Sequence, residues 1–253
     1  MLWYRSWLET RWRFLISLGV LVCSVGGIVF LWPKVVELIP AASNLPESGS
    51  LGGKIREAVE LSRNYPSYIW SQWYAKNLIS LGTLFAVLLG AGGVLSKRSG
   101  GMFMLSLPVS RRHLLGTRAV TGLAELTVLA LAPSVLIPLL SPAVGKTYGI
   151  EDALVYGGCF FIAASLFFSM ALLLSTIFED VWRPLLISLA VCALMVLAEQ
   201  PGLSRWHYGI VRVMSGEDWF RNRQLPWPGL LASAGASVAF FYGAVINLGR
   251  RDF

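Results

Sequence analysis

Six runs of apolar residues, each about as long as a membrane-spanning helix, constrain this chain more than any other feature. The hydrocarbon core of a bilayer is about 30 Å thick, and an α-helix needs about 20 residues to cross it. The six runs cover residues 14–32, 78–95, 119–140, 153–178, 181–198 and 229–248. The fifth run is the least regular because it contains Arg183 near one end. We predict an all-α membrane protein with six transmembrane helices.

Charged residues are scarce along the whole chain. Only 14% of the 253 residues are charged and 55% are hydrophobic, whereas a soluble domain has about 25% charged residues. This composition excludes a soluble enzyme, a disordered tail and a disulfide-rich secreted domain. The three cysteines lie in apolar runs, without disulfide or metal-ligand spacing. No linker or internal repeat divides the sequence, so we predict one membrane domain over residues 1–253.

The first apolar run has an alternative interpretation as a cleaved signal peptide. Ala41, Ala42 and Ser43 resemble the small residues of a cleavage site. The run is nevertheless longer than the roughly 7–15 apolar residues of a signal peptide. We therefore interpret it as a membrane span.

The distribution of Lys and Arg predicts the orientation of the chain. Six spans place both termini on one side of the membrane. The segments on that side hold 11 Lys and Arg in 47 residues, whereas the opposite segments hold 10 in 87 residues. Because short cytoplasmic loops are enriched in these residues, we expect both termini in the cytoplasm. Cationic loops beside anionic membrane lipid also account for the net charge of +7. A nucleic-acid partner is not needed to explain it.

Residues 1–13 have an amphipathic pattern just before the first span. On a helix, Trp3, Trp7 and Phe14 share one face and charged residues lie opposite. Tryptophan rings favour the headgroup level of a membrane, so we predict an interfacial helix here. The alternative is an ordinary aromatic belt with a basic anchor at the end of the first span.

The segment between the second and third spans, residues 96–118, contains five basic residues, no acidic ones and an apolar block. Pro108 follows that block and disfavours helix at the residue before it. Ser110 can cap a new helix that runs from Arg111 to Leu115. We predict a short helix at the membrane surface, suited to docking on a partner protein. The alternative is a basic anchor without a docking role.

The sequence SLPVSRRHLLGTR, residues 106–118, resembles the segment after the second span in type 2 ABC transporter permeases. These proteins are the membrane subunits of bacterial ATP-driven exporters. The end of the chain, residues 250–253, resembles the short basic tail that often ends them, and the number and placement of spans are similar. Family members often have an acidic residue and a Gly-Thr pair before the Leu-Pro element, where this chain has KRSGG at residues 97–101.

The resemblance implies a role for three segments. In this family the N-terminal segment is an amphipathic elbow helix, and the loop after the second span carries a coupling helix that fits a groove on the ATPase subunit. This places six residues at the ATPase contact: Leu107, Pro108, Val109, Ser110, Arg111 and Arg112. Residues 199–228, between the fifth and sixth spans, correspond to an extracytoplasmic segment that dips into the membrane.

The resemblance also implies partners. The chain would pair with a second permease, either a copy or a paralogue, and with a separate ATPase subunit in the bacterial cytoplasmic (inner) membrane. ATP and Mg would bind to that ATPase, and we expect neither a cofactor nor an enzyme activity in this chain. Its nearest approach to a phosphate loop, Gly145–Thr147, has Leu140 where the required earlier glycine would stand.

Glu125 is the one acidic residue within a predicted span, where a charge costs roughly 2.5–3.5 kcal/mol on insertion scales. It is a candidate for the substrate pathway, and the alternative is a structural pairing with Arg118, two turns earlier. In the last span, Gly235, Ala239 and Gly243 recur at every fourth position. Such rows allow helices to approach closely, and we favour packing within the subunit over a dimer seam.

Two other functions remain as alternatives to an exporter permease. An ion-coupled secondary transporter needs ionisable residues near the bilayer midplane, and only Glu125 suggests one. A non-transporting membrane anchor for an ATPase is the second. An intramembrane enzyme is disfavoured because the only histidines, His113 and His207, are predicted on opposite sides of the membrane.

Overall fold

The computed structural model describes residues 2–43, 60–91, 111–178, 180–199 and 209–250, and these residues are helical with short connections. The elements, in chain order, are α1 (Leu2–Ser43), α3 (Tyr65–Ile69), η1 (Trp70–Gly82), α4 (Thr83–Gly90), α6 (Arg111–Leu140), η3 (Ser141–Val144), α7 (Ile150–Ile177), α8 (Trp182–Ala198), α9 (Ile210–Ser215), α10 (Glu217–Asn222) and α11 (Trp227–Arg250). No strand occurs among these residues. The predicted all-α fold class is therefore confirmed.

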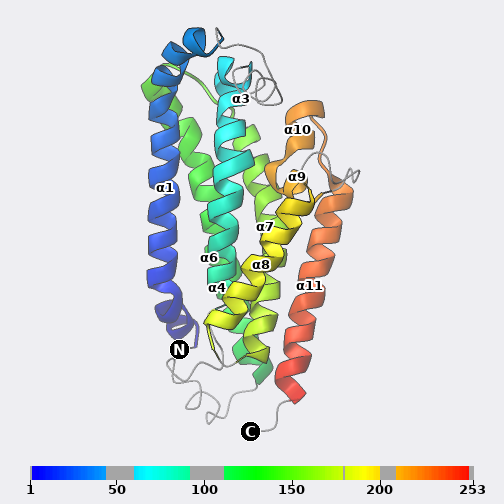
Figure 1. Cartoon of the computed structure of the whole chain (residues 1–253). Helices are drawn as coiled ribbons and strands as arrows, with labels where there is room; N and C mark the ends of the chain where they lie inside the picture. Colours follow the sequence, from blue (N-terminus) through cyan, green and yellow to red (C-terminus); the bar gives the residue numbers. More distant parts are fainter. Residues whose placement is uncertain (1, 44–59, 92–110, 179, 200–208, 251–253) are drawn as a thin grey trace.

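Five helical segments are long and apolar enough to cross a membrane, which is the pattern of a multi-pass membrane protein. They are Ser6–Glu37, Tyr65–Gly90, His113–Val144, Ile150–Ile177 and Trp227–Arg250. The predicted fifth span corresponds to α8, an apolar helix of only 17 residues. At about 1.5 Å per residue, α8 is shorter than the roughly 30 Å of a hydrocarbon core. The start of α1 and the end of α11 lie at the same end of the molecule (Figure 1).

The second span begins earlier than predicted. We expected it over residues 78–95, but the helical column of α3, η1 and α4 already starts at Tyr65. The sequence of its first half is too polar to be recognised as a membrane span. In the structure, however, its aromatic side chains are buried, and both Trp73 and Tyr74 are 0% exposed. Helix packing rather than hydropathy decides where this span starts. The middle of the column is a π-helix of 13 residues, a rare conformation that is frequent at functional sites.

Two predicted surface helices are instead continuous with membrane spans. Residues 2–13 belong to the 42-residue helix α1, so the structure does not separate an interfacial helix from the first span. Likewise, the helix predicted to end near Leu115 forms the first turns of α6, which continues to Leu140. No proline interrupts either junction. Near the second junction, the Thr117 hydroxyl donates a hydrogen bond to the Leu114 carbonyl, 2.9 Å away, within the helix.

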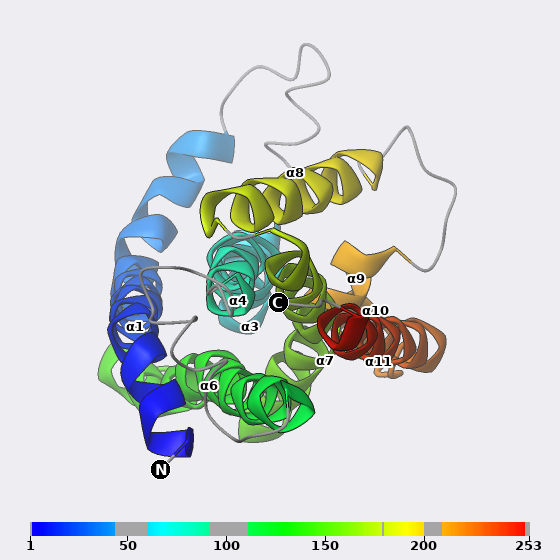
Figure 2. The same cartoon turned by 90° about the horizontal axis from the view of Figure 1, so that it is seen from below.

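The interior of the fold is built around α7 and the α3–η1–α4 column. In the view along the helices, α1, α6, α8 and α11 surround these two elements (Figure 2). Helix α7 packs against α11, α6 and α4, and it is the most enclosed of the candidate spans. Helices α7 and α4 approach closely at Gly90 of α4, where an added Cβ atom would lie 2.4 Å from the Phe168 carbonyl oxygen of α7. A glycine is required there because a side chain has no room.

Candidate functional site

Polar side chains of α1 and α6 meet inside the molecule, near the end where both helices begin. Thr10 on α1 forms a hydrogen bond through Oγ1 with Glu125 Oε1 on α6. Beside them, Arg118 Nη1 lies 3.6 Å from Glu9 Oε2. Glu125 and Thr10 are each only 5% exposed. We call these four residues the α1–α6 polar cluster. It joins the first and third spans.

The surroundings of Glu125 differ from the pairing considered from the sequence. Arg118 forms its ion pair with Glu9 on α1 rather than with Glu125. The second carboxyl oxygen, Glu125 Oε2, is buried and has no hydrogen-bond partner among the described residues. The Thr10–Glu125 contact joins residues 115 positions apart, and no sequence pattern indicated it.

The residues predicted to contact an ATPase fall at the edge of the described structure. Leu107, Pro108, Val109 and Ser110 lie outside the described residues. Helix α6 begins at Arg111, and Arg112 follows in its first turn. The segment that resembles the coupling loop therefore runs directly into the helix that carries Arg118 and Glu125. Arg111 and Arg112 share one continuous helix with Arg118 and Glu125.

The N-terminal aromatic residues face away from the protein, whereas the polar face of the same helix points into it. Trp3 is 52% exposed and Trp7 is 42% exposed. Phe14 is partly buried and packs against the core. On the opposite face, Arg13 Nη1 donates a hydrogen bond to the Leu88 carbonyl at 3.4 Å. An apolar face turned outward and a polar face turned inward suit a lipid environment.

At the opposite end of the molecule, α9 and α10 form a compact cap over residues 210–222. Glu199, just after α8, accepts hydrogen bonds from the backbone N–H groups of Ile210 (2.5 Å) and Val211 (2.8 Å). Within the cap, Arg212 Nη2 lies 2.7 Å from Asp218 Oδ1. Glu199 therefore satisfies the first N–H groups of α9, and Arg212 and Asp218 neutralise each other. The cap lies within the segment predicted to dip into the membrane, and its depth in a bilayer is an expectation of the family resemblance.

Asp152, in the first turn of α7, links the cap region to the helical core. It accepts a hydrogen bond from Trp219 Nε1 at 2.9 Å and a second one from Arg223 Nη1. The hydrogen bond from Arg223 to Asp152 raises the pKa of Arg223. Arg223 also has a left-handed backbone conformation, with a φ of 55°. Sequence reasoning did not single out Asp152. An acidic residue just before an apolar run was the available signal, but its partners lie about 70 residues away.

Aromatic side chains of α1, α3, η1 and the segment before α7 pack together in the interior. Tyr65 lies edge-on to Trp32, with ring centroids 5.4 Å apart, and its hydroxyl forms a 2.7 Å hydrogen bond with Ser141 Oγ. Nearby, burial raises the pKa of Tyr148. Two polar atoms in this region, Trp73 Nε1 and Tyr74 Oη, have no hydrogen-bond partner among the described residues. The region is a packed aromatic core with unsatisfied donors.

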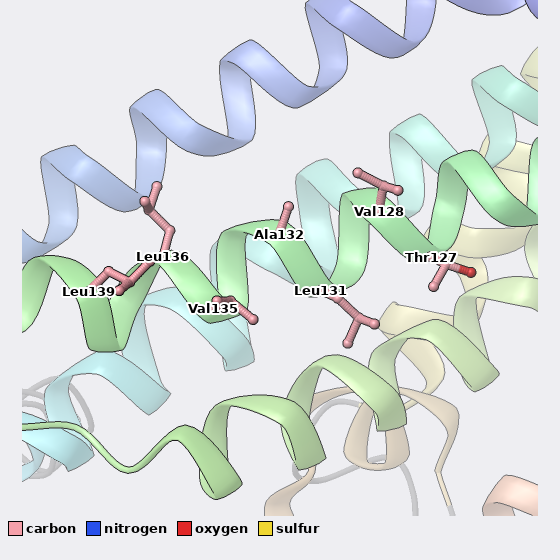
Figure 3. Close-up of a pocket in the computed structure, with 7 residues that line it drawn as sticks. All are labelled: Thr127, Val128, Leu131, Ala132, Val135, Leu136 and Leu139. Atoms are coloured by element: carbon pink, nitrogen blue, oxygen red, sulfur yellow. The ribbon is translucent and has the colours of Figure 1, made fainter.

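One face of α6 forms a shallow apolar groove of about 420 Å³, which is open to the surroundings. Its lining residues are Thr127, Val128, Leu131, Ala132, Val135, Leu136 and Leu139 (Figure 3). The Thr127 hydroxyl is bonded to the Leu123 carbonyl at 2.8 Å, so the groove offers an incoming group almost no polar contact. Chemically it can accommodate only apolar chains.

The described residues contain no candidate metal site. No group of three or more His, Cys, Asp or Glu side chains lies close enough to hold a metal ion within the part of the chain that the structure describes. Cys23, Cys159 and Cys192 are all free thiols. The functional features that remain are a buried polar cluster, an ion-paired cap and an apolar groove. Comparison with protein-family models, curated proteins and solved structures gives no match for this chain.

Proposed function

We propose that this chain is the permease subunit of an ATP-binding cassette transporter that works as an exporter. Two permeases, as a homodimer or with a paralogue, would enclose the substrate pathway. A separate ATPase subunit would bind ATP and Mg and dock against the loop before α6. The chemical step would belong to the ATPase, and this chain would convert its movement into a change between inward-facing and outward-facing states.

The observation that carries the proposal is the similarity of residues 106–118 to the coupling segment of type 2 permeases. Two structural facts support it. The last part of that segment forms the beginning of α6, and both ends of the described chain lie at one end of the molecule (Figure 1).

The finer topology belongs to the same proposal. Helix α8 would be a sixth membrane crossing, shortened because the α9–α10 cap fills the outer part of the membrane beside it. Residues 1–13 would rest at the cytoplasmic membrane surface, where Trp3 and Trp7 meet the headgroups. Both termini would lie in the cytoplasm of a bacterium. A cysteine at Gly49 should then react with an impermeant reagent added from outside the cell.

Co-purification tests the proposal directly. The tagged full chain, expressed in its own host and extracted in mild detergent, should carry an ATPase polypeptide with it. The same chain with a scrambled 106–112 segment should reach the membrane in equal amount and lose that partner. Recovery of both proteins without any ATPase, together with transport driven by an ion gradient, would contradict an ATP-driven permease.

An ion-coupled secondary transporter is the second candidate, and one observation favours it. Glu125 is a buried carboxyl group within a membrane span, with one oxygen that has no hydrogen-bond donor among the described residues. Intramembrane carboxyl groups of this kind often serve ion-coupled transport. The two candidates differ in what drives uptake into inverted vesicles, which is ATP for the permease complex and an ion gradient for the secondary transporter.

A further inference from the structure

Thr10 lies between three hydrogen-bond acceptors, and its hydroxyl has a single proton to donate. Thr10 Oγ1 is 3.3 Å from the Ser6 carbonyl oxygen and 3.4 Å from the Trp7 carbonyl oxygen, and it also contacts Glu125 Oε1. If Glu125 is ionised, the Thr10 hydroxyl donates its proton to Oε1 and makes no hydrogen bond to the backbone carbonyls. If Glu125 is protonated, it donates to Thr10, and Thr10 donates to a carbonyl. In the second arrangement the hydroxyl both donates and accepts a hydrogen bond, whereas in the first it only donates.

Three arginines on α1 and α6 make contacts with groups other than Glu125. On α6, Arg118 pairs with Glu9 of α1 at 3.6 Å. On α1, Arg13 donates to the Leu88 carbonyl of α4 at 3.4 Å. Arg11 of α1 places its guanidinium 5.7 Å from the centre of the Trp12 ring. None of these three forms a hydrogen bond or an ion pair with Glu125 among the described residues, so Arg118 acts on the carboxyl group only through space.

The other elements that pack against α6 add no charge beside Glu125. The sequence of α4 has no ionisable residue. The acids of α7, Glu151 and Asp152, lie in its first turn, at the far end of the molecule. The one charged residue of α11 is Arg250, exposed at its last position. On η1, Lys76 is exposed, and on α6 itself His113 lies three turns before Glu125 and is also exposed.

We infer that Glu125 is a proton-binding site and that it carries its proton while α1 and α6 are packed as in this structure. The proton on Oε1 is donated to Thr10 Oγ1, and Oε2 is then a neutral carbonyl oxygen. Burying a neutral carbonyl oxygen without a hydrogen-bond donor costs far less free energy than burying an ionised carboxylate oxygen in the same place. The charges of Glu9 and Arg118 offset each other within their ion pair.

The site links the packing of α1 against α6 to pH. When α1 separates from α6 and water reaches Glu125, the O–H bond breaks, the electron pair stays on the carboxylate, and one proton passes to water. The packed arrangement is therefore favoured at low pH and weakens as the pH rises and the group ionises. This inference goes beyond the proposed transport function, because it concerns only the two helices and holds with or without an ATPase.

Infrared difference spectroscopy on the purified full chain in lipid nanodiscs tests the inference. At neutral pH, wild type minus Glu125→Gln should show the C=O stretching band of one protonated carboxyl group, shifted in D₂O. Wild type minus Glu37→Gln, which replaces an exposed acid on α1, should show only carboxylate bands. A wild type minus Glu125→Gln spectrum with carboxylate bands alone would overturn the inference.

Thermal unfolding gives a second readout that does not depend on transport. The Tm of wild type should fall as the pH is raised, whereas Glu125→Gln, which retains an N–H donor for Thr10, should have a nearly constant Tm. Thr10→Val should lower the Tm at acidic pH, where the hydrogen bond is complete. A wild-type Tm that follows the same pH curve as Glu125→Gln would contradict a proton at this site.

Discussion

Trp70 of η1 stacks face to face on Phe220 of α10, with ring centroids 4.1 Å apart and ring planes within 2° of parallel. The same indole donates a hydrogen bond from Nε1 to the Ser215 carbonyl at 3.0 Å. Both contacts join the π-helical part of the second span to the α9–α10 cap. One aromatic side chain, Trp70, therefore fixes the cap to the second span through an apolar and a polar contact.

Replacing Phe220 with Ala should release the cap from the second span. A fully buried Phe→Ala change costs roughly 3–5 kcal/mol, and because Phe220 is only partly buried we expect a loss of about 2 kcal/mol. The measurement is thermal unfolding of the full chain in detergent. Phe220→Tyr, which keeps the stacked ring, serves as the control and should stay close to wild type. Equal stability of Phe220→Ala and wild type would show that the stack does not hold the cap.

Replacing Glu199 with Ala should unfold the first turn of α9. The carboxylate accepts the N–H groups of Ile210 and Val211, which have no partner within the helix, as at any helix N-terminus. Loss of such a cap costs about 0.5–2 kcal/mol. Hydrogen exchange at these two amides should become faster in the variant, while Glu60→Ala, an exposed acid, should leave it unchanged. Unchanged protection in Glu199→Ala would rule out the capping role.

Replacing Gly90 with Ala should separate α4 from α7. The new Cβ would lie 2.4 Å from the Phe168 carbonyl oxygen, and overpacking of this kind costs roughly 1–3 kcal/mol. Gly27→Ala on α1 is the matched control, because a Cβ there would have no atom within 4 Å. The Tm should fall for the first variant and stay constant or rise slightly for the second. The same Tm for both variants would mean that α4 and α7 are farther apart than described.

Sequence patterns predicted the long helices because length and hydropathy are properties of a continuous segment. The runs at 119–140, 153–178 and 229–248 each coincide with a spanning helix. They failed for the start of the second span, since the polar atoms of its aromatic residues are buried by neighbouring helices. Sequence patterns also did not show which residues on one face of a helix contact a neighbouring helix. In the small-residue row of α11, Gly243 lies against Leu173, but Gly235 has no atom within 4 Å of its Cβ position.

The candidate sites were predictable only where one residue is unusual by itself. Glu125 stood out because a carboxyl group in a membrane span is costly. Its partner Thr10 did not, since a threonine before an apolar run is ordinary and the two residues are 115 positions apart. Glu199 likewise became meaningful only when the fold brought it to the first amides of α9. Pairing across the fold depends on helix positions, and no single segment contains that information.

The last prediction concerns the proposed ATPase contact. Reversing the charge of Arg111 and Arg112 together should lower permease-dependent ATPase activity at least about tenfold, which corresponds to about 1.4 kcal/mol of lost interaction. The physical reason is that like charges placed across a complementary interface oppose docking. The matched control is the double reversal of Arg250 and Arg251, which changes the same number of charges in the tail of the chain. That control should leave most of the ATPase activity intact, and the level of each variant in the membrane should match wild type. Full activity in the Arg111 and Arg112 variant would show that the ATPase docks elsewhere, even if it still co-purifies with the chain.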